Sequence, residues 1–207
     1  MVAGDFNNDE QVDLAVTCPG RNTLNVFFGD GYGNFSEETV LKSAWKSRLN
    51  WATVGDFNGD DRLDLAVVNT RKNNIGILFG FGNGTFQGQK LYSTGIYSNP
   101  DHMVLNDFNN DRHLDLAVTN LFTNEVGIML GTANGTFLEQ ITFPYAFGDV
   151  SLSVVIATGD LNGDRRLDIV IYVGGPNGNS PGNLSILLNS CDCCRFKNTE
   201  RRIHTYK

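Results

Sequence analysis

The chain has 207 residues, of which 41% are hydrophobic, and a formal net charge of −7 at pH 7. A chain of this length can bury a substantial core, in one all-β domain or in two smaller domains. The acidic balance argues against nucleic acid as a partner. No apolar run is long enough to span a bilayer, so we expect no insertion into a membrane.

Four copies of one segment divide the chain into repeats. The first copy reads Gly-Asp-Phe-Asn-Asn-Asp-Glu-Gln-Val-Asp-Leu-Ala-Val, and the four copies cover residues 4–16, 55–67, 106–118 and 159–171. An apolar block follows each copy, at 24–29, 75–80, 126–131 and 184–189. In three copies a Gly/Asn turn then leads into Phe35, Phe86 or Phe137. A fixed internal period indicates a repeat architecture, with units at about 1–43, 44–94, 95–148 and 149–190.

Each repeat is expected to contain four strands. In the second repeat we place them at residues 52–54, 63–68 and 75–79 and from about Phe86 to Tyr92. The third strand is apolar on both faces, as in stacked sheets. The second alternates large residues with Asp64 and Ala66, so we expect its small residues to face the neighbouring sheet. Four strands in a repeat of this length favour an all-β fold, a β-propeller of four four-stranded blades, over a β-solenoid, which usually has shorter repeats.

The end of the chain departs from the repeat pattern. Cys191, Cys193 and Cys194 replace the Gly/Asn turn of the fourth repeat, and Cys18 is the fourth cysteine. The spacing forms no zinc framework, and the pairing of any disulfides stays open. We expect the segment 196–206 to supply the missing last strand and the four blades to close into one small ring. The alternative is a section of a larger propeller, whose apolar flanks could self-associate.

Each repeat carries an Asp-x-Asn-x-Asp-x-x-x-Asp loop that predicts a Ca²⁺ site. Side chains at the first, third, fifth and ninth places, with the carbonyl of the seventh, can supply most of the roughly six to eight oxygens that Ca²⁺ takes. The twelfth place is apolar, where an EF-hand needs Glu. The alternative is an Asx turn that only caps its own backbone. Three Asp in each of four loops favour a cation, because their charges repel one another.

The predicted ligands follow from this register, four side chains and one backbone carbonyl in each loop. They are Asp5, Asn7, Asp9, Gln11 and Asp13 in the first repeat; Asp56, Asn58, Asp60, Arg62 and Asp64 in the second; Asp107, Asn109, Asp111, His113 and Asp115 in the third; and Asp160, Asn162, Asp164, Arg166 and Asp168 in the fourth. The seventh residue of each set contributes only its carbonyl. We therefore expect about four Ca²⁺ ions in the chain.

These copies resemble FG-GAP (VCBS-type) repeats, the blades of the integrin α-subunit propeller. The matching motifs are the Asp-Phe-Asn-Gly/Asn-Asp loop, the Leu-Asp-Leu-Ala-Val strand and the Gly-Asn-Gly-Thr-Phe turn, and the resemblance covers about residues 2–190. It implies a calcium-stabilised propeller, often seven-bladed, found in extracellular adhesion proteins, some lectins and secreted proteins. This chain departs from that pattern because it shows four repeats.

Two further sets of residues are candidates for modification and for partner binding. Four Asn-x-Ser/Thr sequons predict a secreted glycoprotein, although Asn-Gly is also a good hairpin turn; they are Asn34, Asn83, Asn134 and Asn183. Aromatic and Arg residues gather at the sheet end where the first strand of each blade begins and the second strand ends. Protein interfaces are enriched in these residue types. The residues gathered here are Trp45, Arg48, Trp51, Arg71, Tyr97, Phe122 and Tyr145. Packing between blades is the alternative for each of them.

The sequence predicts a non-catalytic interaction or adhesion module. No nucleophile and base stand in a recognisable pattern, and His102, His113 and His204 are scattered. A lectin-type propeller is the alternative, and an enzyme domain on the same scaffold is less favoured. The partner would be a protein or a glycan. We expect an extracellular or secreted location, although the first residues are no signal peptide and begin inside a repeat, as in a fragment.

Overall fold

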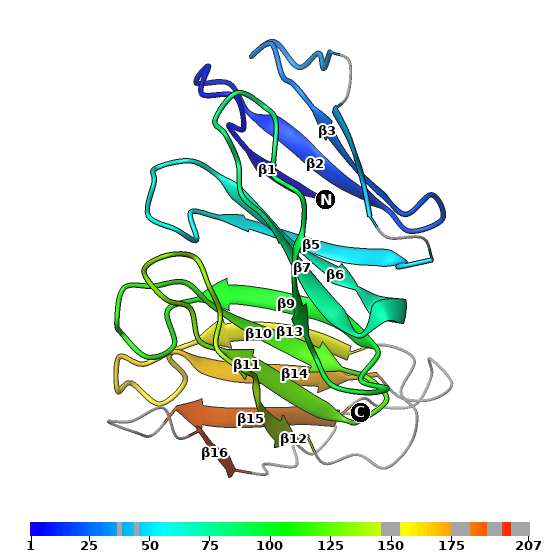
Figure 1. Ribbon diagram of the computed structural model, residues 1–207. Coiled ribbons are helices and arrows are strands. Elements are labelled where there is room, and N and C mark those ends of the chain that lie inside the picture. Colours follow the sequence, from blue (N-terminus) through cyan, green and yellow to red (C-terminus); the bar gives the residue numbers. More distant parts are fainter. Residues whose placement is uncertain (37–38, 44–45, 146–153, 175–182, 190–195, 200–207) are drawn as a thin grey trace, which may run out of the picture.

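The computed structural model describes residues 1–36, 39–43, 46–145, 154–174, 183–189 and 196–199. These residues form four four-stranded antiparallel sheets, which follow one another along the chain as the blades of a propeller do. The sheets lie in a row from the first, which holds the N-terminus at one end, to the fourth at the other (Figure 1). The predicted all-β fold with four-stranded blades is confirmed.

Each sheet is a simple meander in which consecutive strands pair. The first contains β1 (Val2–Gly4), β2 (Asp13–Cys18), β3 (Thr23–Phe27) and β4 (Thr39–Lys42). The second contains β5 (Leu49–Gly55), β6 (Asp64–Asn69), the 3-10 turn η1 (Thr70–Lys72), β7 (Asn74–Leu78) and β8 (Lys90–Ser93). The third contains β9 (Pro100–Asn106), β10 (Asp115–Asn120), β11 (Glu125–Met129) and β12 (Ile141–Pro144). The fourth contains β13 (Val154–Gly159), β14 (Asp168–Val173), β15 (Asn183–Asn189) and β16 (Phe196–Thr199), and β16 pairs with β15.

The last strand of each of the first three blades is shorter than predicted. In the second blade Phe86 forms only an isolated bridge with Gly80, and β8 begins at Lys90. Between them the side chain of Gln89 lies across Gly76, where a Cβ would collide with it, and accepts a hydrogen bond of 3.0 Å from Asn69 Nδ2. The Gln89 side chain thus lies over the third strand just before β8 begins.

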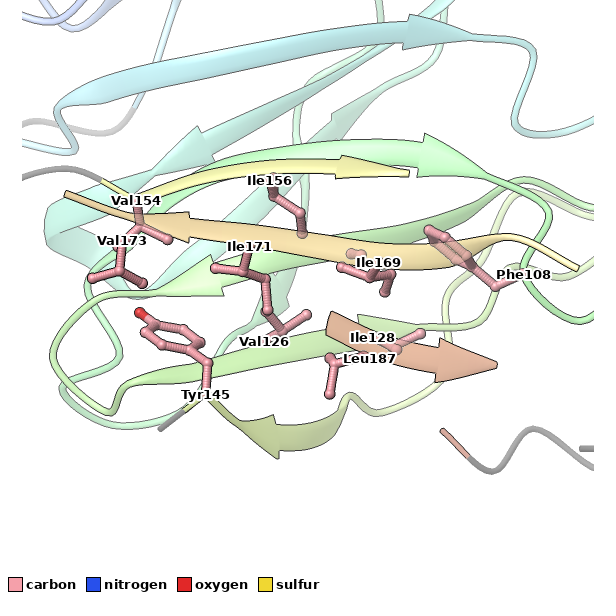
Figure 2. Packing of buried hydrophobic residues seen from close by; sticks show 11 residues of the cluster. Phe108, Val126, Ile128, Tyr145, Val154, Ile156, Ile169, Ile171, Val173 and Leu187 are labelled. Carbon is pink, nitrogen blue, oxygen red and sulfur yellow. The ribbon is translucent and has the colours of Figure 1, made fainter. Parts of the chain in front are cut away.

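Three apolar cores fill the spaces between consecutive sheets. Strand β6 is buried on both faces: Leu65 and Val67 pack toward the first sheet, and Ala66 and Val68 pack toward the third. The small Ala66 faces a neighbouring sheet as expected, and so do the large Leu65 and Val67 on the other face. Figure 2 shows the core between the third and fourth sheets, where Val126 lies beside Ile171 of β14.

The expected closed ring of four blades is not what the described residues form. Packing between sheets joins the first to the second through β2 and β5, the second to the third through β5 and β9, and the third to the fourth through β9 and β13. The first and fourth sheets lie at opposite ends of the row (Figure 1). Closing four blades would need a quarter turn between consecutive sheets. The described chain is a propeller section.

Candidate metal loops

The four Asp-rich loops lie at one end of the sheets. Each connects the first and second strands of its blade, and it lies beside the turn between the third and fourth strands. Strands of an antiparallel meander alternate in direction, so these two connections meet at the same sheet end. The predicted ligands are thus grouped loop by loop on one side of the arc.

Each loop is wound around its own carboxylates. In the second loop Asp56 Oδ1 accepts hydrogen bonds from the backbone N–H of Gly59 at 2.7 Å and of Asp60 at 3.1 Å, and Asp56 Oδ2 accepts one from Asp61 at 2.9 Å. Asn58 Oδ1 accepts the N–H of Asp60 at 3.2 Å, and Asp60 Oδ1 accepts that of Arg62 at 3.0 Å. The other three loops repeat the pattern at the equivalent residues. This arrangement brings the first, third and fifth side chains together.

The ninth Asp has a role that the sequence reasoning missed. Asp64 is fully buried, and its two carboxylate oxygens accept hydrogen bonds from the backbone N–H of Phe57 at 2.9 Å and of Gly80 at 2.8 Å. The same two bonds are made by Asp13, Asp115 and Asp168. This carboxylate ties the loop to the end of the third strand, so it acts as a structural pin. The two donors stand at positions that the repeats share, the one occupied by Phe57 and the one occupied by Gly80, and this recurrence was the signal available in the sequence.

Burial makes ionisation of two of these pins, Asp64 and Asp115, unfavourable. Loss of water raises the pKa of Asp64 and of Asp115 to about 6, against the opposing effect of the two backbone hydrogen bonds on each. The charges of Asp56 and Asp60 raise the pKa of Asp64 further. A cation in the loop would favour the ionised carboxylate, because it would offset this repulsion.

The loops offer the donor chemistry of a Ca²⁺ site. All the side-chain donors are carboxylate or amide oxygens, which are the ligands that Ca²⁺ prefers. Within the described part of the chain, however, no three His, Cys, Asp or Glu side chains are gathered as a ready-made metal site. In the second loop, Asp56, Asn58 and Asp60 accept backbone N–H groups within the turn, and the ninth residue, Asp64, turns both oxygens to the buried backbone. The hydrogen bonds of the loops are those of the Asx-turn alternative. The same oxygen atoms are also the kind of ligand that fits a Ca²⁺ ion.

Five of the predicted partner residues are exposed: Arg48, Trp51, Arg71, Tyr97 and Phe122. The backbone beside Arg48 pairs with that of Arg71, whose N–H donates to the Ser47 carbonyl, and one blade later the Phe122 N–H donates to the Ser98 carbonyl, next to Tyr97. Trp51 is partly exposed and stacks on His102 with 4.4 Å between ring centroids.

Tyr145 was wrongly assigned to the partner surface, and Trp45 lies outside the described residues. Tyr145 is only 2% exposed, packs in the core between the third and fourth sheets, and donates a hydrogen bond of 3.3 Å to the Asn120 carbonyl (Figure 2). Packing between blades is the correct interpretation of this residue. Its burial raises the pKa of its hydroxyl.

All four sequon asparagines are exposed. Asn83 and Asn134 also build their turns: Asn83 Oδ1 accepts hydrogen bonds from the Thr85 N–H at 3.1 Å and hydroxyl at 2.6 Å, and Asn134 does the same with Thr136. Of the cysteines, Cys18 is a free thiol, and Cys191, Cys193 and Cys194 lie outside the described residues.

We expect glycan on Asn34 or Asn83 when the chain is expressed through a eukaryotic secretory pathway, because both lie on exposed turns. Peptide mass spectrometry of the secreted protein, before and after removal of N-glycans, measures this directly. If all four sequons are bare, the asparagines serve only their turns.

Comparison with known proteins gives consistent matches along the chain. A family model described as the FG-GAP-like repeat matches residues 5–67, 56–118 and 107–171, which together take in all four loops. The T-cell immunomodulatory proteins of Rattus norvegicus and Homo sapiens are 28% and 27% identical to this chain over 135 residues. These matches cover 62% of the chain but only 22% of the length of each relative.

Two solved structures share the arrangement of the sheets. A protein from Lactobacillus plantarum superposes with a TM-score of 0.65 at 12% identity, covering 92% of this chain and 54% of that one. The Photorhabdus luminescens Tc holotoxin pore superposes with a TM-score of 0.54 at 16% identity, covering 95% of this chain and 9% of that one. At such low identity these likenesses concern the fold alone. The described residues contain no helix with the length and hydropathy of a membrane span.

Proposed function

The chain belongs to the FG-GAP-like repeat family, and on this premise we propose that it is a calcium-binding propeller section that serves as a non-catalytic interaction or adhesion module. One observation carries the proposal. The same loop, whose candidate side-chain ligands are all oxygen atoms, occurs four times with the same backbone conformation. One such loop could be a turn alone. Four loops, each with the carboxylates of its first and fifth Asp close together, concentrate negative charge that a cation would balance.

In this proposal the first, third and fifth side chains of each loop hold one Ca²⁺. The seventh carbonyl, that of Arg62 in the second loop, joins the set, and the ninth carboxylate, that of Asp64, would bind the ion through the lone pairs that its two backbone hydrogen bonds leave free. The metal supplies positive charge and ties together oxygens that otherwise repel one another. The ninth Asp also accepts the N–H groups of Phe57 and Gly80, so order in the loop would extend to the end of the third strand. Calcium would therefore be structural.

We place the module outside the cell, in line with the extracellular setting that the resemblance to integrin-type blades implies. The relatives' name, T-cell immunomodulatory protein, refers to an action on cells, and a protein partner is in keeping with such an action. For this chain we propose a protein partner at the exposed Arg and aromatic groups, with a glycan partner as the second candidate. Among the described residues no arrangement favours catalysis, and the ring of His102 is held between Asp101 and Trp51.

Replacement of Tyr97 and Phe122 by Ala should weaken capture of the partner at least tenfold, because exposed aromatic side chains carry much of the energy of interfaces. A pull-down from extracellular fractions and a glycan array, both with the wild type and the double variant, measure the effect and separate a protein from a glycan ligand. Leu138→Ala is the matched control, since Leu138 is exposed at the opposite end of the sheets. Equal capture by the double variant and the wild type would contradict this partner surface.

A further inference from the structure

Two of the four Asp loops contain a chemically labile pair of residues at their third and fourth places. These places read Asn58-Gly59 in the second blade and Asn162-Gly163 in the fourth, whereas the first and third blades have Asn at both. The fourth place has positive φ in all four loops, so the fold accepts either residue there. An Asn followed by Gly is the pair most prone to deamidation, because no side chain hinders attack by the Gly nitrogen.

The backbone of both Asn-Gly loops leaves the Gly nitrogen accessible. Gly59 and Gly163 are exposed, and nothing lies within 4 Å of the place that a Cβ would take on either of them. The Gly59 N–H donates to Asp56 Oδ1 at 2.7 Å, and the Gly163 N–H donates to Asp160 Oδ1 at 2.7 Å. Each acceptor is a side chain of the same loop, so these hydrogen bonds do not tie the main chain to another blade.

The Asn side chain of each pair is turned toward the residues that follow it. Asn58 Oδ1 accepts the N–H of Asp60 at 3.2 Å, and Asn58 Nδ2 donates to Asp60 Oδ2 at 3.1 Å. Asn162 makes the same two bonds with Asp164, both at 3.0 Å. Such an Asx turn folds the side-chain amide back over the next peptide group, so the attacking and attacked atoms lie in one short turn.

Two other Asn-Gly pairs have the Asx turn but a fixed backbone. In Asn83-Gly84 the glycine is buried, and its N–H donates to the Phe6 carbonyl of the preceding blade at 2.8 Å. In Asn134-Gly135 the glycine is also buried, and its N–H donates to the Thr132 carbonyl at 2.9 Å. Ring closure needs the Gly nitrogen to lose its hydrogen and the main chain to rearrange, and this packing opposes both. A fifth pair, at 177–178, lies outside the described residues.

We propose that Asn58 and Asn162 are sites of spontaneous deamidation and that Ca²⁺ in their loops slows the reaction. The Gly59 nitrogen attacks the side-chain carbonyl carbon of Asn58, its proton passes by way of the Asp56 carboxylate to the departing nitrogen, and ammonia leaves. Water then opens the resulting succinimide at either carbonyl, which leaves an aspartate or an isoaspartate. The isoaspartate adds one methylene group to the main chain and so displaces the third side chain of the loop.

The protection by Ca²⁺ rests on the proposed function, whereas the choice of sites does not. In the proposed metal site the Asn58 carbonyl oxygen and the Asp56 carboxylate both bind the ion. The amide is then fixed in place, and the carboxylate is not free to receive the proton of the Gly nitrogen. Removal of the ion should therefore open both sites to the reaction.

The test is peptide mass spectrometry of the full chain, incubated for weeks at neutral pH with chelator or with excess Ca²⁺. The chain is produced without glycosylation, so that Asn83 and Asn134 carry no sugar. With chelator, Asn58 and Asn162 should deamidate at least about tenfold faster than Asn7, which is followed by Asn, and also faster than the two buried pairs. Ca²⁺ at about 100 times its Kd leaves roughly one loop in a hundred empty, so it should slow both at least about tenfold.

Gly59→Asn is the matched variant, because it gives the second loop the residue that the first and third loops have at this place. It should lower the rate at Asn58 to that at Asn7 and leave the rate at Asn162 unchanged. Equal rates at all four described pairs, or no effect of Gly59→Asn, would overturn the choice of sites.

The outcome with Ca²⁺ separates this proposal from the calcium proposal on which its second half rests. Equal rates with chelator and with Ca²⁺, in a chain that titration shows to bind the ion, would overturn the protection. Equal rates in a chain that binds no Ca²⁺ would contradict the calcium sites themselves, while faster deamidation of Asn58 and Asn162 than of Asn83 and Asn134 would still support the assignment of the two sites.

Discussion

Removal of calcium is expected to lower the melting temperature of the chain by about 20 °C or more. A ligand held at about 100 times its Kd stabilises the folded state by about 2.7 kcal/mol per site. For a domain of this size each kcal/mol raises the melting temperature by about 2–4 °C, so four independent sites together give this shift. Thermal unfolding followed by circular dichroism, with excess Ca²⁺ and with a chelator, measures it.

Two controls make the chelation experiment specific. Mg²⁺ at the same concentration should restore little of the lost stability, because it demands a tighter octahedral site than a flexible oxygen-rich loop offers. Asp60→Ala removes one fifth-place ligand and should reduce the calcium-dependent shift by about a quarter if the sites contribute equally. Superimposable melts with Ca²⁺ and with chelator would mean that the loops are Asx turns without a structural metal.

Asp64→Ala should destabilise the second blade by about 2–4 kcal/mol even in the presence of chelator. The substitution leaves the buried backbone N–H groups of Phe57 and Gly80 without acceptors, and each unsatisfied buried donor costs about 1–3 kcal/mol. Burial raises the pKa of Asp64, so removing its buried charge relieves an unfavourable interaction. The expected loss of stability is therefore smaller than the largest cost of two unsatisfied buried N–H groups. Urea unfolding of calcium-free wild type and variant gives the difference.

Asp60→Ala is the matched comparison for this pin. Asp60 lies on the exposed loop and accepts a hydrogen bond from Arg62 within the turn, so its loss without calcium should cost under about 1 kcal/mol. Both substitutions remove one carboxylate from the same loop and differ in burial. Equal destabilisation of the calcium-free protein by the two would show that the ninth Asp is not a structural pin.

The repeat pattern was sufficient to predict the blades, and single residues were not sufficient to predict how the blades meet. The period of the Asp loops and the apolar third strands predicted four four-stranded sheets, because strand number and two-sided burial are properties of each repeat. The open arc depends on the angle between consecutive sheets, which results from packing across whole interfaces and is not a property of one repeat. The position of Gln89 before the last strand likewise involves a hydrogen bond with Asn69, a residue 20 positions away in the sequence.

The functional residues divide along the same line. The register of the loop placed the first, third and fifth residues together, since hydrogen bonds within a short turn are local. The pin made by Asp64 joins positions 16 residues apart, and the repeat alone did not indicate that both oxygens turn to the backbone. Tyr145 was misassigned because an aromatic residue near a blade edge serves either a surface or a core, and its hydroxyl contact with Asn120 decides for the core.

The number of Ca²⁺ ions bound by the chain tests the central claim most directly. Isothermal titration of chelator-treated, refolded protein with Ca²⁺ should give about four ions per chain, one for each Asp-x-Asn-x-Asp-x-x-x-Asp loop. Asp60→Ala should reduce this number by one, and Mg²⁺ should compete weakly. A stoichiometry near zero, or one that Asp60→Ala leaves unchanged, would contradict the account of these loops as calcium sites.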